Sequence, residues 1–234
     1  MRVLWLASWY PSKNDPLTGD FFQRHANIAA INHTIDVLHI KRDDQIQANI
    51  DISFSQKNNL SEKIILYKPF LHKIKFVSNF FSAIYWWRFN LKEINKYIQT
   101  HGKPDIIHVH GWIASLMPLY LKQYYKDEPL FSKSKVVTSI YDNEISGDLN
   151  PEIISKIKFD EVESETLNVL ENPTYENLYK LSIMNSDGVV FASENIKKSY
   201  LDVAANSKIP VLKCGFKDGF EKEYMNFYND KILN

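Results

Sequence analysis

Short runs of apolar residues alternate with stretches of helical period along most of the chain. Several runs are continuous Val, Ile and Leu, which is typical of strands that are covered on both faces of a sheet. The runs predict strands at Val3–Ser8, Ile35–Ile40, Ile64–Tyr67, Asp105–His110, Val136–Tyr141, Gly188–Ser193 and Pro210–Lys213. The stretches between them predict helices at Phe21–Ile31, Lys75–Thr100, Ile113–Tyr125, Tyr175–Asn185, Ile196–Ala205 and Phe220–Leu233.

This alternation predicts an α/β fold with a doubly wound, mostly parallel, Rossmann-like sheet, formed by residues 1–234 as one domain. In such sheets, ligands bind beyond the carboxyl ends of the strands. Candidate functional residues are therefore expected in the loops after Ser8, His110, Tyr141 and Ser193.

Two segments depart from the alternation. Gln45–Glu62 is polar and irregular, and we interpret it as a surface excursion. Asp142–Asn172 is an insertion rich in charge, in which we expect one or two short helices.

The charge balance argues against two classes of partner. Lys and Arg together number 28, as do Asp and Glu, so the formal net charge is zero and no overall field attracts nucleic acid or an anionic membrane.

Cys214 is the only cysteine, which excludes an internal disulfide and a cysteine zinc site and favours a reducing compartment. Pro11 stops the N-terminal apolar run, which we interpret as a core strand rather than a signal peptide. We therefore expect a cytoplasmic protein.

One stretch rich in aromatic residues raises the hypothesis of membrane binding. Phe76–Trp87 is too short to span a bilayer, and Lys68–Arg88 mixes basic and aromatic residues that could lie on a membrane surface. Such a pattern more commonly forms a buried helix that is flanked by basic residues, so we expect no membrane partner.

Phosphate-binding signatures are nearly absent. The chain has neither G-x-G-x-x-G nor G-x-x-x-x-G-K-[ST], which excludes a dinucleotide fingerprint and a P-loop. Gly19 alone precedes the predicted helix from Phe21, where backbone N–H groups and the helix dipole could meet an anion. The alternative is that Gly19 only makes a turn and Asp20 caps the helix. On these residues alone the turn is favoured.

Histidines mark the end of the strand Asp105–His110. His108 and His110 point to one face, but no carboxylate or cysteine completes a metal set, so we expect no metal. We interpret His110 as a hydrogen-bond donor lining a cleft and His108 as a satisfied core histidine. Trp112 follows and is either a packing anchor or a platform for a sugar ring, with packing favoured.

Acidic residues follow the strand Val136–Tyr141. Asp142, Asn143 and Glu144 could act as acid, base or sugar-hydroxyl ligands, or could form a helix cap or turn. A paired-carboxylate hydrolase would also need a second acid across the cleft.

The segment Pro104–Trp112, which reads PDIIHVHGW, resembles the N-terminal half of glycogen and starch synthases, retaining glucosyltransferases of the GT-B fold. Lys135–Asp142, Asn172–Leu178 and Ser186–Val190 resemble a short bacterial form, common among Bacteroidetes, that consists of little more than this half. The resemblance covers residues 104–234.

Residues 1–103 resemble a related group. Trp9–Ser12 and Gly19–Ala26 look like the start of GT-B glycosyltransferases of the capsule, lipopolysaccharide and mannosyl type. The two resemblances meet at the strand Pro104–His110, which both groups share. A natural divergent member and a fusion of two related halves both stay open.

The chain departs from the glycogen synthase pattern at four places, one of which is Ile113, where the family has His. The family's Lys-x-Gly-Gly loop, which meets the nucleotide diphosphate, is reduced to Gly19. The family has Asp where Gly111 stands and a cleft histidine where Tyr141 stands, so no catalytic residue is assigned. The resemblance also implies that the GT-B C-terminal nucleotide-sugar domain is absent from this chain.

The resemblance implies transfer of glucose from ADP-glucose to an α-1,4-glucan, with no cofactor beyond the nucleotide-sugar donor. The expected partners are that donor, the glucan acceptor, and either a separate GT-B C-terminal domain or a second copy. The expected substrate contacts are Gly19, His110, Gly111, Trp112, Tyr141 and Asp142. The alternatives are a non-catalytic glucan-binding or regulatory half-protein and the N-terminal half of a capsule-type glycosyltransferase.

Overall fold

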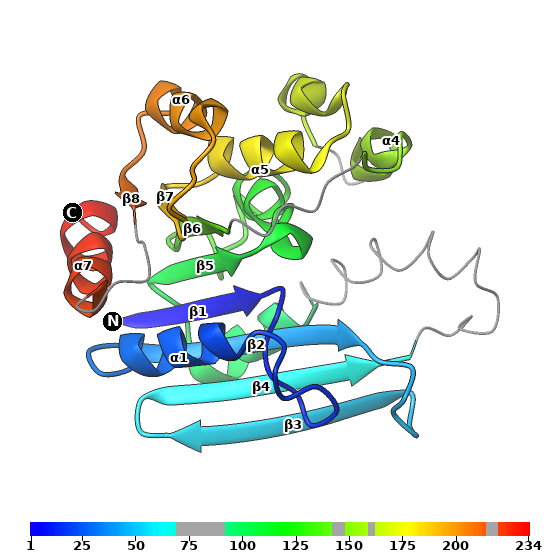
Figure 1. Ribbon diagram of the computed structural model, residues 1–234, viewed down its shortest axis with the longest axis vertical. Coiled ribbons are helices and arrows are strands. Elements are labelled where there is room, and N and C mark those ends of the chain that lie inside the picture. Colours follow the sequence, from blue (N-terminus) through cyan, green and yellow to red (C-terminus); the bar gives the residue numbers. More distant parts are fainter. Residues whose placement is uncertain (69–91, 142–147, 159–161, 214–219) are drawn as a thin grey trace. The chain divides into compact units, whose positions relative to one another are not determined.

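The structure, a computed structural model, describes residues 1–68, 92–141, 148–158, 162–213 and 220–234. Its contacts divide the chain into two compact units, Met1–Asp105 and Ile106–Asn234. Figure 1 shows the elements of both units. Each unit is an α/β layer structure in its own right.

The first unit contains a four-stranded part of the sheet in the order β3-β4-β2-β1. Its strands are β1 (Arg2–Ala7), β2 (Thr34–Arg42), β3 (Ile50–Lys57) and β4 (Leu60–Tyr67). β1, β2 and β4 run parallel, and β3 is antiparallel to β4. β1 and β2 are buried along nearly their whole length, as expected for central parallel strands.

Helices cover both faces of the first unit's strands. Adjacent residues of β4 point to opposite faces, and each reaches a different helix. Glu62 accepts a hydrogen bond from Gln23 of α1 (Asp20–Ala29) at 2.8 Å, whereas Lys63 pairs with Glu93 of the helical residues 92–101 at 3.0 Å. The first unit therefore has the two-sided arrangement expected of a doubly wound sheet.

The prediction that Gln45–Glu62 is irregular is wrong, although most of these residues do lie at the surface. These residues contain β3 and the start of β4, joined by a tight turn in which Asn58 has a φ of 54°. Asparagine tolerates this left-handed conformation better than most residues. β3 is exposed along almost its whole length, so it lacks the continuous apolar run by which the other strands were found.

The second unit has the strand order β5-β6-β7-β8, all parallel. Its strands are β5 (Ile106–His110), β6 (Lys135–Ile140), β7 (Gly188–Phe191) and β8 (Val211–Lys213). Its helices are η1 (Trp112–Ala114), α3 (Met117–Leu119), η2 (Tyr120–Tyr124), α4 (Ile153–Lys158), η3 (Ser164–Leu170), α5 (Tyr175–Met184), α6 (Lys198–Asn206), α7 (Phe220–Asn226) and η4 (Phe227–Ile232).

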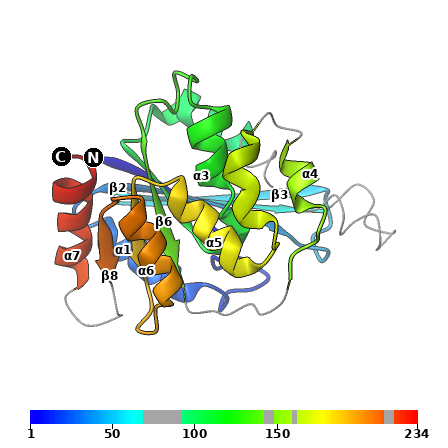
Figure 2. The ribbon, with the colours of Figure 1, turned by 90° about the horizontal axis from the view of Figure 1, so that it is seen from above.

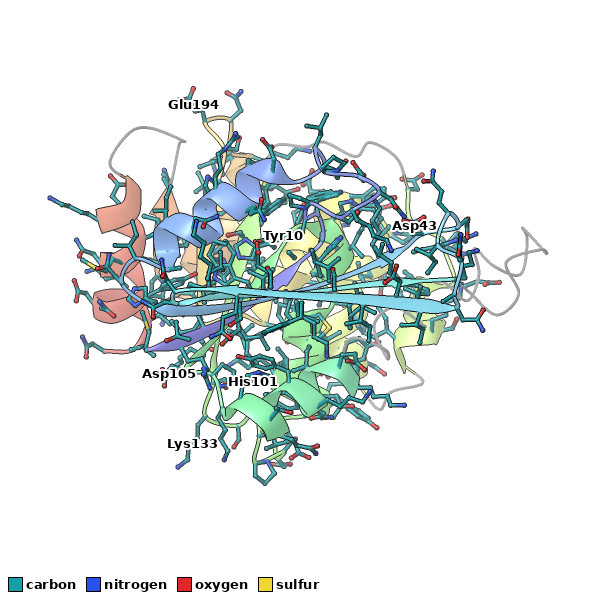
Figure 3. The ribbon with its side chains drawn as sticks, turned by 90° about the horizontal axis from the view of Figure 1, so that it is seen from below. Tyr10, Asp43, His101, Asp105, Lys133 and Glu194 are labelled. Carbon is teal, nitrogen blue, oxygen red and sulfur yellow. The ribbon has the colours of Figure 1, made fainter. Side chains whose placement is uncertain are left out.

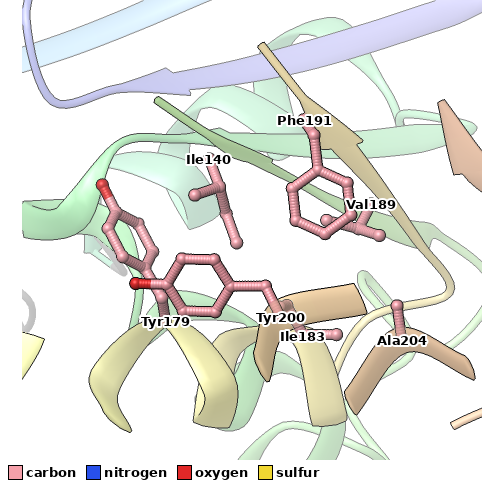
Figure 4. Close-up of a cluster of buried hydrophobic side chains, with 7 residues drawn as sticks. All are labelled: Ile140, Tyr179, Ile183, Val189, Phe191, Tyr200 and Ala204. Carbon is pink, nitrogen blue, oxygen red and sulfur yellow. The ribbon is translucent and has the colours of Figure 1, made fainter. Parts of the chain in front are cut away.

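One face of the second unit's strands packs against α5 and α6, which lie side by side in Figures 1 and 2. The buried cluster between them, drawn in Figure 4, comprises Ile140, Tyr179, Ile183, Val189, Phe191, Tyr200 and Ala204. Thr174 caps α5, because its hydroxyl accepts a hydrogen bond from the backbone N–H of Asn177 at 3.1 Å.

The terminal segment α7–η4 packs on the opposite face. It buries Tyr224, Phe227, Tyr228 and Ile232. A Cβ atom on Gly188 of β7 would lie 2.3 Å from Ile232 Cδ1 and 3.1 Å from a Phe227 ring carbon, so a larger residue would displace the segment. The terminal helix is therefore an integral layer of this unit.

The α/β, mostly parallel fold and the short helices expected within 142–172 are confirmed. The helix predicted over Ile113–Tyr125 is divided into a 3₁₀ turn, a short α-helix and a π-helical turn. Pro118, with no N–H to donate, lies at the start of the α-helical piece. The helix predicted over Lys75–Thr100 is described only from residue 92, and most of the aromatic stretch Lys68–Arg88 lies outside the described residues. In the described part of the chain, no helix is both long and apolar enough to cross a bilayer.

Candidate functional site

Polar side chains gather at the carboxyl ends of β5 and β6. His108 and His110 share one face of β5, and their ring centroids are 4.0 Å apart. Ser139 of β6 lies opposite His110 in the parallel register and so points to this face too. The face is the one covered by α7–η4, and it forms a buried polar layer beneath the aromatic side chains of that segment.

Both ring nitrogens of His108 are hydrogen-bonded. Its Nε2 lies 2.7 Å from the Ser139 hydroxyl oxygen, and its Nδ1 is hydrogen-bonded to the Tyr228 hydroxyl. The Tyr224 hydroxyl reaches Ser139 at 3.4 Å. Burial lowers the pKa of His108 well below its ordinary value, so the ring is neutral and one nitrogen donates while the other accepts. The interpretation of His108 as a satisfied core histidine is confirmed.

His110 and Tyr141, two of the predicted substrate contacts, lie next to each other in the structure. The Tyr141 hydroxyl lies 2.8 Å from His110 Nδ1, and both side chains are buried. Tyr141 therefore makes a direct hydrogen bond to the strand-end histidine. Contact of either side chain with a sugar stays a prediction.

The backbone conformation at position 111 favours glycine. The φ of 84° and ψ of 172° of Gly111 belong to a region that residues with a Cβ atom almost never adopt. Its N–H donates to the Ser139 carbonyl at 3.3 Å, and its own carbonyl accepts from the Ser115 hydroxyl at 3.1 Å. Glycine at this position therefore permits the turn between β5 and η1.

Trp112 lies on the other side of the strands. It packs against the cluster beneath α5 and α6, and its ring meets Tyr175 edge-on with centroids 5.1 Å apart. Ile140, which belongs to that cluster, alternates along β6 with Ser139 and so points away from His108. The contacts match the packing interpretation of Trp112, and its role as a sugar platform stays a prediction.

Gly19 belongs to the first unit, where it is the N-cap of α1 with a φ of 77°. A Cβ atom there would lie 2.7 Å from the Trp9 carbonyl carbon and the Tyr10 amide nitrogen, so glycine is needed for a close approach of backbone to backbone. The turn interpretation of Gly19 is the one that this geometry supports. Asp20 does not cap the helix, because it lies in the first turn and accepts a hydrogen bond from Arg24 at 3.0 Å.

The loop of residues 8–19, between β1 and α1, is tied to the neighbouring strands. Asp15 pairs with Lys41 of β2 at 2.7 Å, which lowers the pKa of Asp15, and Lys13 bonds to Asp51 of β3. Tyr10 lies between α1 and the strands (Figure 3), and its hydroxyl donates to Glu62 at 2.5 Å. Both lysines at this loop already face carboxylates.

Asp142, the remaining predicted contact, lies outside the described residues. The described residues include no group of three or more His, Cys, Asp or Glu side chains arranged to hold a metal ion. Three hydroxyls of the network around His108, those of Ser139, Tyr224 and Tyr228, were not among the predicted site residues. Two signals could have indicated them: a polar residue inside an apolar strand, and tyrosines spaced four apart on the buried face of the last helix.

Comparison with known proteins identifies the family. The family model described as starch synthase catalytic domain matches residues 10–206. This range includes much of the first hundred residues as well as the strand-end histidines. The chain therefore belongs to the starch synthase catalytic domain family.

Two curated relatives show how much of a full-length protein is represented. A glycogen synthase of Chlorobium luteolum is 31% identical over 129 residues, which are 55% of this chain and 24% of the relative. A glycogen synthase of Thermotoga petrophila is 42% identical over 53 residues, which are 23% of this chain and 11% of the relative. The matches thus span less than a third of either relative.

A solved structure supports the fold. The catalytic domain of starch synthase IV from Arabidopsis thaliana, bound to ADP and acarbose, matches with a TM-score of 0.57 at 16% identity. The match covers 91% of this chain and 51% of that one. At this identity the likeness establishes the α/β architecture.

Proposed function

We propose that this chain is the N-terminal part of a cytoplasmic glucosyltransferase that passes glucose from ADP-glucose to the non-reducing end of an α-1,4-glucan. The observation that carries the proposal is the hydrogen-bonded pair of His110 and Tyr141 at the ends of β5 and β6, in a member of the starch synthase catalytic domain family. Strand ends of this kind are where α/β proteins bind ligands.

In this proposal Tyr141 binds a sugar hydroxyl through a neutral hydrogen bond. A phenol is neutral at pH 7 and can donate one hydrogen bond while its oxygen accepts another. Since His110 and Tyr141 are both buried, sugar binding requires a local rearrangement at the ends of β5 and β6. The remaining proposed contacts are Gly111, Trp112 and Asp142 with the sugar, and Gly19 near the diphosphate.

The departing diphosphate needs positive charge. Preorganised cations and N–H donors that meet developing charge supply a large share of catalysis in such transfers. The lysines at loop 8–19 are already engaged, Lys13 with Asp51 and Lys41 with Asp15. We therefore propose that a second GT-B domain supplies the groups that hold the diphosphate.

The test is a transfer assay on a glycogen primer with radiolabelled ADP-glucose and UDP-glucose. We expect the chain alone to give incorporation near background, and a mixture with a separately expressed GT-B C-terminal domain to raise it with ADP-glucose. Tyr141→Phe, which keeps the ring and removes the hydroxyl, should lower that gain. Tyr141→His alone should not restore turnover, because it does not supply the diphosphate contacts.

Two results would contradict the proposal. Robust turnover by the unmixed chain would show that a second domain is not needed, and failure of the chain to bind glucan would remove the acceptor role.

A non-catalytic glucan-binding role is the second candidate, favoured by the tyrosine at the position of the family's cleft histidine. Retention on glycogen with no incorporation in any mixture would support that role.

A further inference from the structure

An apolar stripe runs along β3 at the outer edge of the first unit. Ile50, Ile52 and Phe54 are 47%, 55% and 58% exposed. They alternate along the strand and so lie on one face, the face on which Ile65 and Tyr67 of β4 are buried. Figure 1 shows β3 as the last strand on this side of the unit. Exposed alternating apolar residues on a whole strand of this kind mark an interaction surface.

The backbone of β3 is also available for pairing. Lys57 and Leu60 close the hairpin, and the Lys68 N–H donates to the Asn49 carbonyl at 2.9 Å, so the odd-numbered residues of β3 exchange hydrogen bonds with β4. The even-numbered residues therefore direct their N–H and C=O groups away from β4. Among the described strands, β3 pairs with β4 alone. It carries no proline, and a row of unpaired groups on such an edge is a template for another strand.

We propose that β3 is a dimer interface, where β3 of a second copy of this chain pairs antiparallel to it across a two-fold axis at Phe54. The paired edge would join the two sheets and would set Phe54 against the partner's Phe54. The pairing is isologous, because the same strand serves on both sides. This inference is independent of the proposed function.

Charge complementarity favours a second copy of this chain as the partner of β3, and it favours this register. With Phe54 on the axis, Asp51 faces the partner's Lys57, and Lys57 faces the partner's Asp51. These are non-hydrogen-bonded positions, where Cα atoms come to about 4.5 Å and side chains approach most closely. Opposite charges there stabilise the pairing. Moving the axis to Ser53 would place Asp51 against a serine and lose both charge pairs.

The first experiment measures self-association by sedimentation velocity over a concentration series. We expect a reversible dimer for the wild type. Phe54→Lys places a charge at the axis, opposite its own copy, and should raise the dimer dissociation constant by about tenfold or more. Ile31→Lys is the matched control, since Ile31 is 69% exposed and lies outside β3; it should leave the dissociation constant unchanged. Circular dichroism of each variant checks that the fold is kept.

The second experiment tests the register. Asp51→Lys and Lys57→Asp should each weaken the dimer several-fold, and the double variant should restore it, because the exchanged charges again face each other. Lys13 pairs with Asp51 within the same chain. Lys13→Ala removes this pair alone, so it measures the effect of losing the pair separately from the effect of losing the dimer contact. A wild type that stays monomeric at every concentration, or a dimer indifferent to Phe54→Lys, would overturn the interface. A double variant that stays weak would overturn the register.

Discussion

Two groups of polar contacts, one in each unit, differ in charge and in burial. In the first unit, ionic groups fasten a surface loop, as in the pairs of Lys41 with Asp15 and Lys13 with Asp51. In the second unit, neutral groups form a buried network in which His108 meets the hydroxyls of Ser139 and Tyr228. Water can replace a lost partner at the surface, but not in the interior. The second unit should therefore depend more strongly on each single contact.

The largest effect should come from removing the segment that covers the polar layer. Deleting residues 220–234 removes Tyr224, Phe227, Tyr228 and Ile232, which are at most 5% exposed. Each buried side chain of this size contributes about 1.5–3 kcal/mol. The sum is comparable with the whole stability of a typical domain, about 5–15 kcal/mol. We expect the second unit to lose cooperative unfolding, as measured by thermal melting and by hydrogen exchange of β5 and β6.

Deleting only residues 233–234 is the matched control, because both side chains are exposed. This shorter deletion should leave the melting temperature unchanged. A full deletion that melted like the intact chain would show that the segment is not needed for folding.

Acid should destabilise both units through buried histidines. Burial lowers the pKa of His25 and of His39 to about 4, and it lowers that of His108 well below the ordinary value. The unfolded chain binds these protons near pH 6.5, so the stability that these groups contribute is complete above that pH and is lost as the pH falls towards 4. A shift of this size corresponds to roughly 3 kcal/mol for each of the first two histidines at pH 4.

Urea unfolding at pH 8, 6 and 5 would measure this loss. His39→Gln keeps a side-chain N–H for the Ala7 carbonyl, which His39 Nδ1 contacts at 2.8 Å, but cannot titrate. Its free energy of unfolding should therefore fall less steeply with acid. Equal slopes for variant and wild type would mean that His39 does not contribute.

A pair of matched variants compares the two units directly. Tyr10 and Tyr228 are both buried, and each hydroxyl reaches across to another element. Tyr228→Phe removes the hydroxyl that is hydrogen-bonded to His108 Nδ1 in the interior, at a cost of about 1–3 kcal/mol. Tyr10→Phe should cost about 1 kcal/mol or less, because Glu62 keeps its hydrogen bonds from Gln23 and Ser55. Urea unfolding of both variants gives the comparison, and a larger loss for Tyr10→Phe would reverse it.

Most of the fold could be predicted from apolar periodicity because parallel strands are buried on both faces. Examples are β2, in which Ile35–Ile40 are all buried, and β6, in which all residues but Lys135 are buried. β3 could not be found in this way, since its pairing depends on the tight turn at Asn58 and on β4 rather than on burial. The alternation of Ile50, Ile52 and Phe54 with polar residues was a period-two signal, but a search for continuous apolar runs does not detect it.

The candidate site could be predicted in part. Strand-end position indicated His110 and Tyr141, and their hydrogen bond requires only that β5 and β6 be neighbours. The network around His108 could not be predicted, since it joins residues 120 positions apart through the terminal helix. Trp112 illustrates a further limit: a residue next to the site in sequence packs with Tyr175 on the opposite side of the strands.

The smallest effect should come from the ionic contact at loop 8–19. Lys41→Met keeps most of the aliphatic length and removes the charge that faces Asp15, a pair whose side chains are each about a third exposed. Exposed pairs of this kind contribute little to global stability and are screened by salt, so the melting temperature should change by about 2 °C or less. The local effect should be clearer, because Asp15 also accepts a hydrogen bond from the Thr18 N–H at 3.2 Å and so organises the approach to Gly19. Amide exchange of residues 12–20 should therefore accelerate in the variant at low salt, while that of β5 and β6 stays unchanged. Wild-type loop exchange should rise with salt towards the rate of the variant, since salt weakens the contact that the variant lacks. Equal loop exchange in the two proteins at low salt would show that the backbone, through Gly19 and the bridge between Ser12 and Asp15, holds the loop without the charge pair.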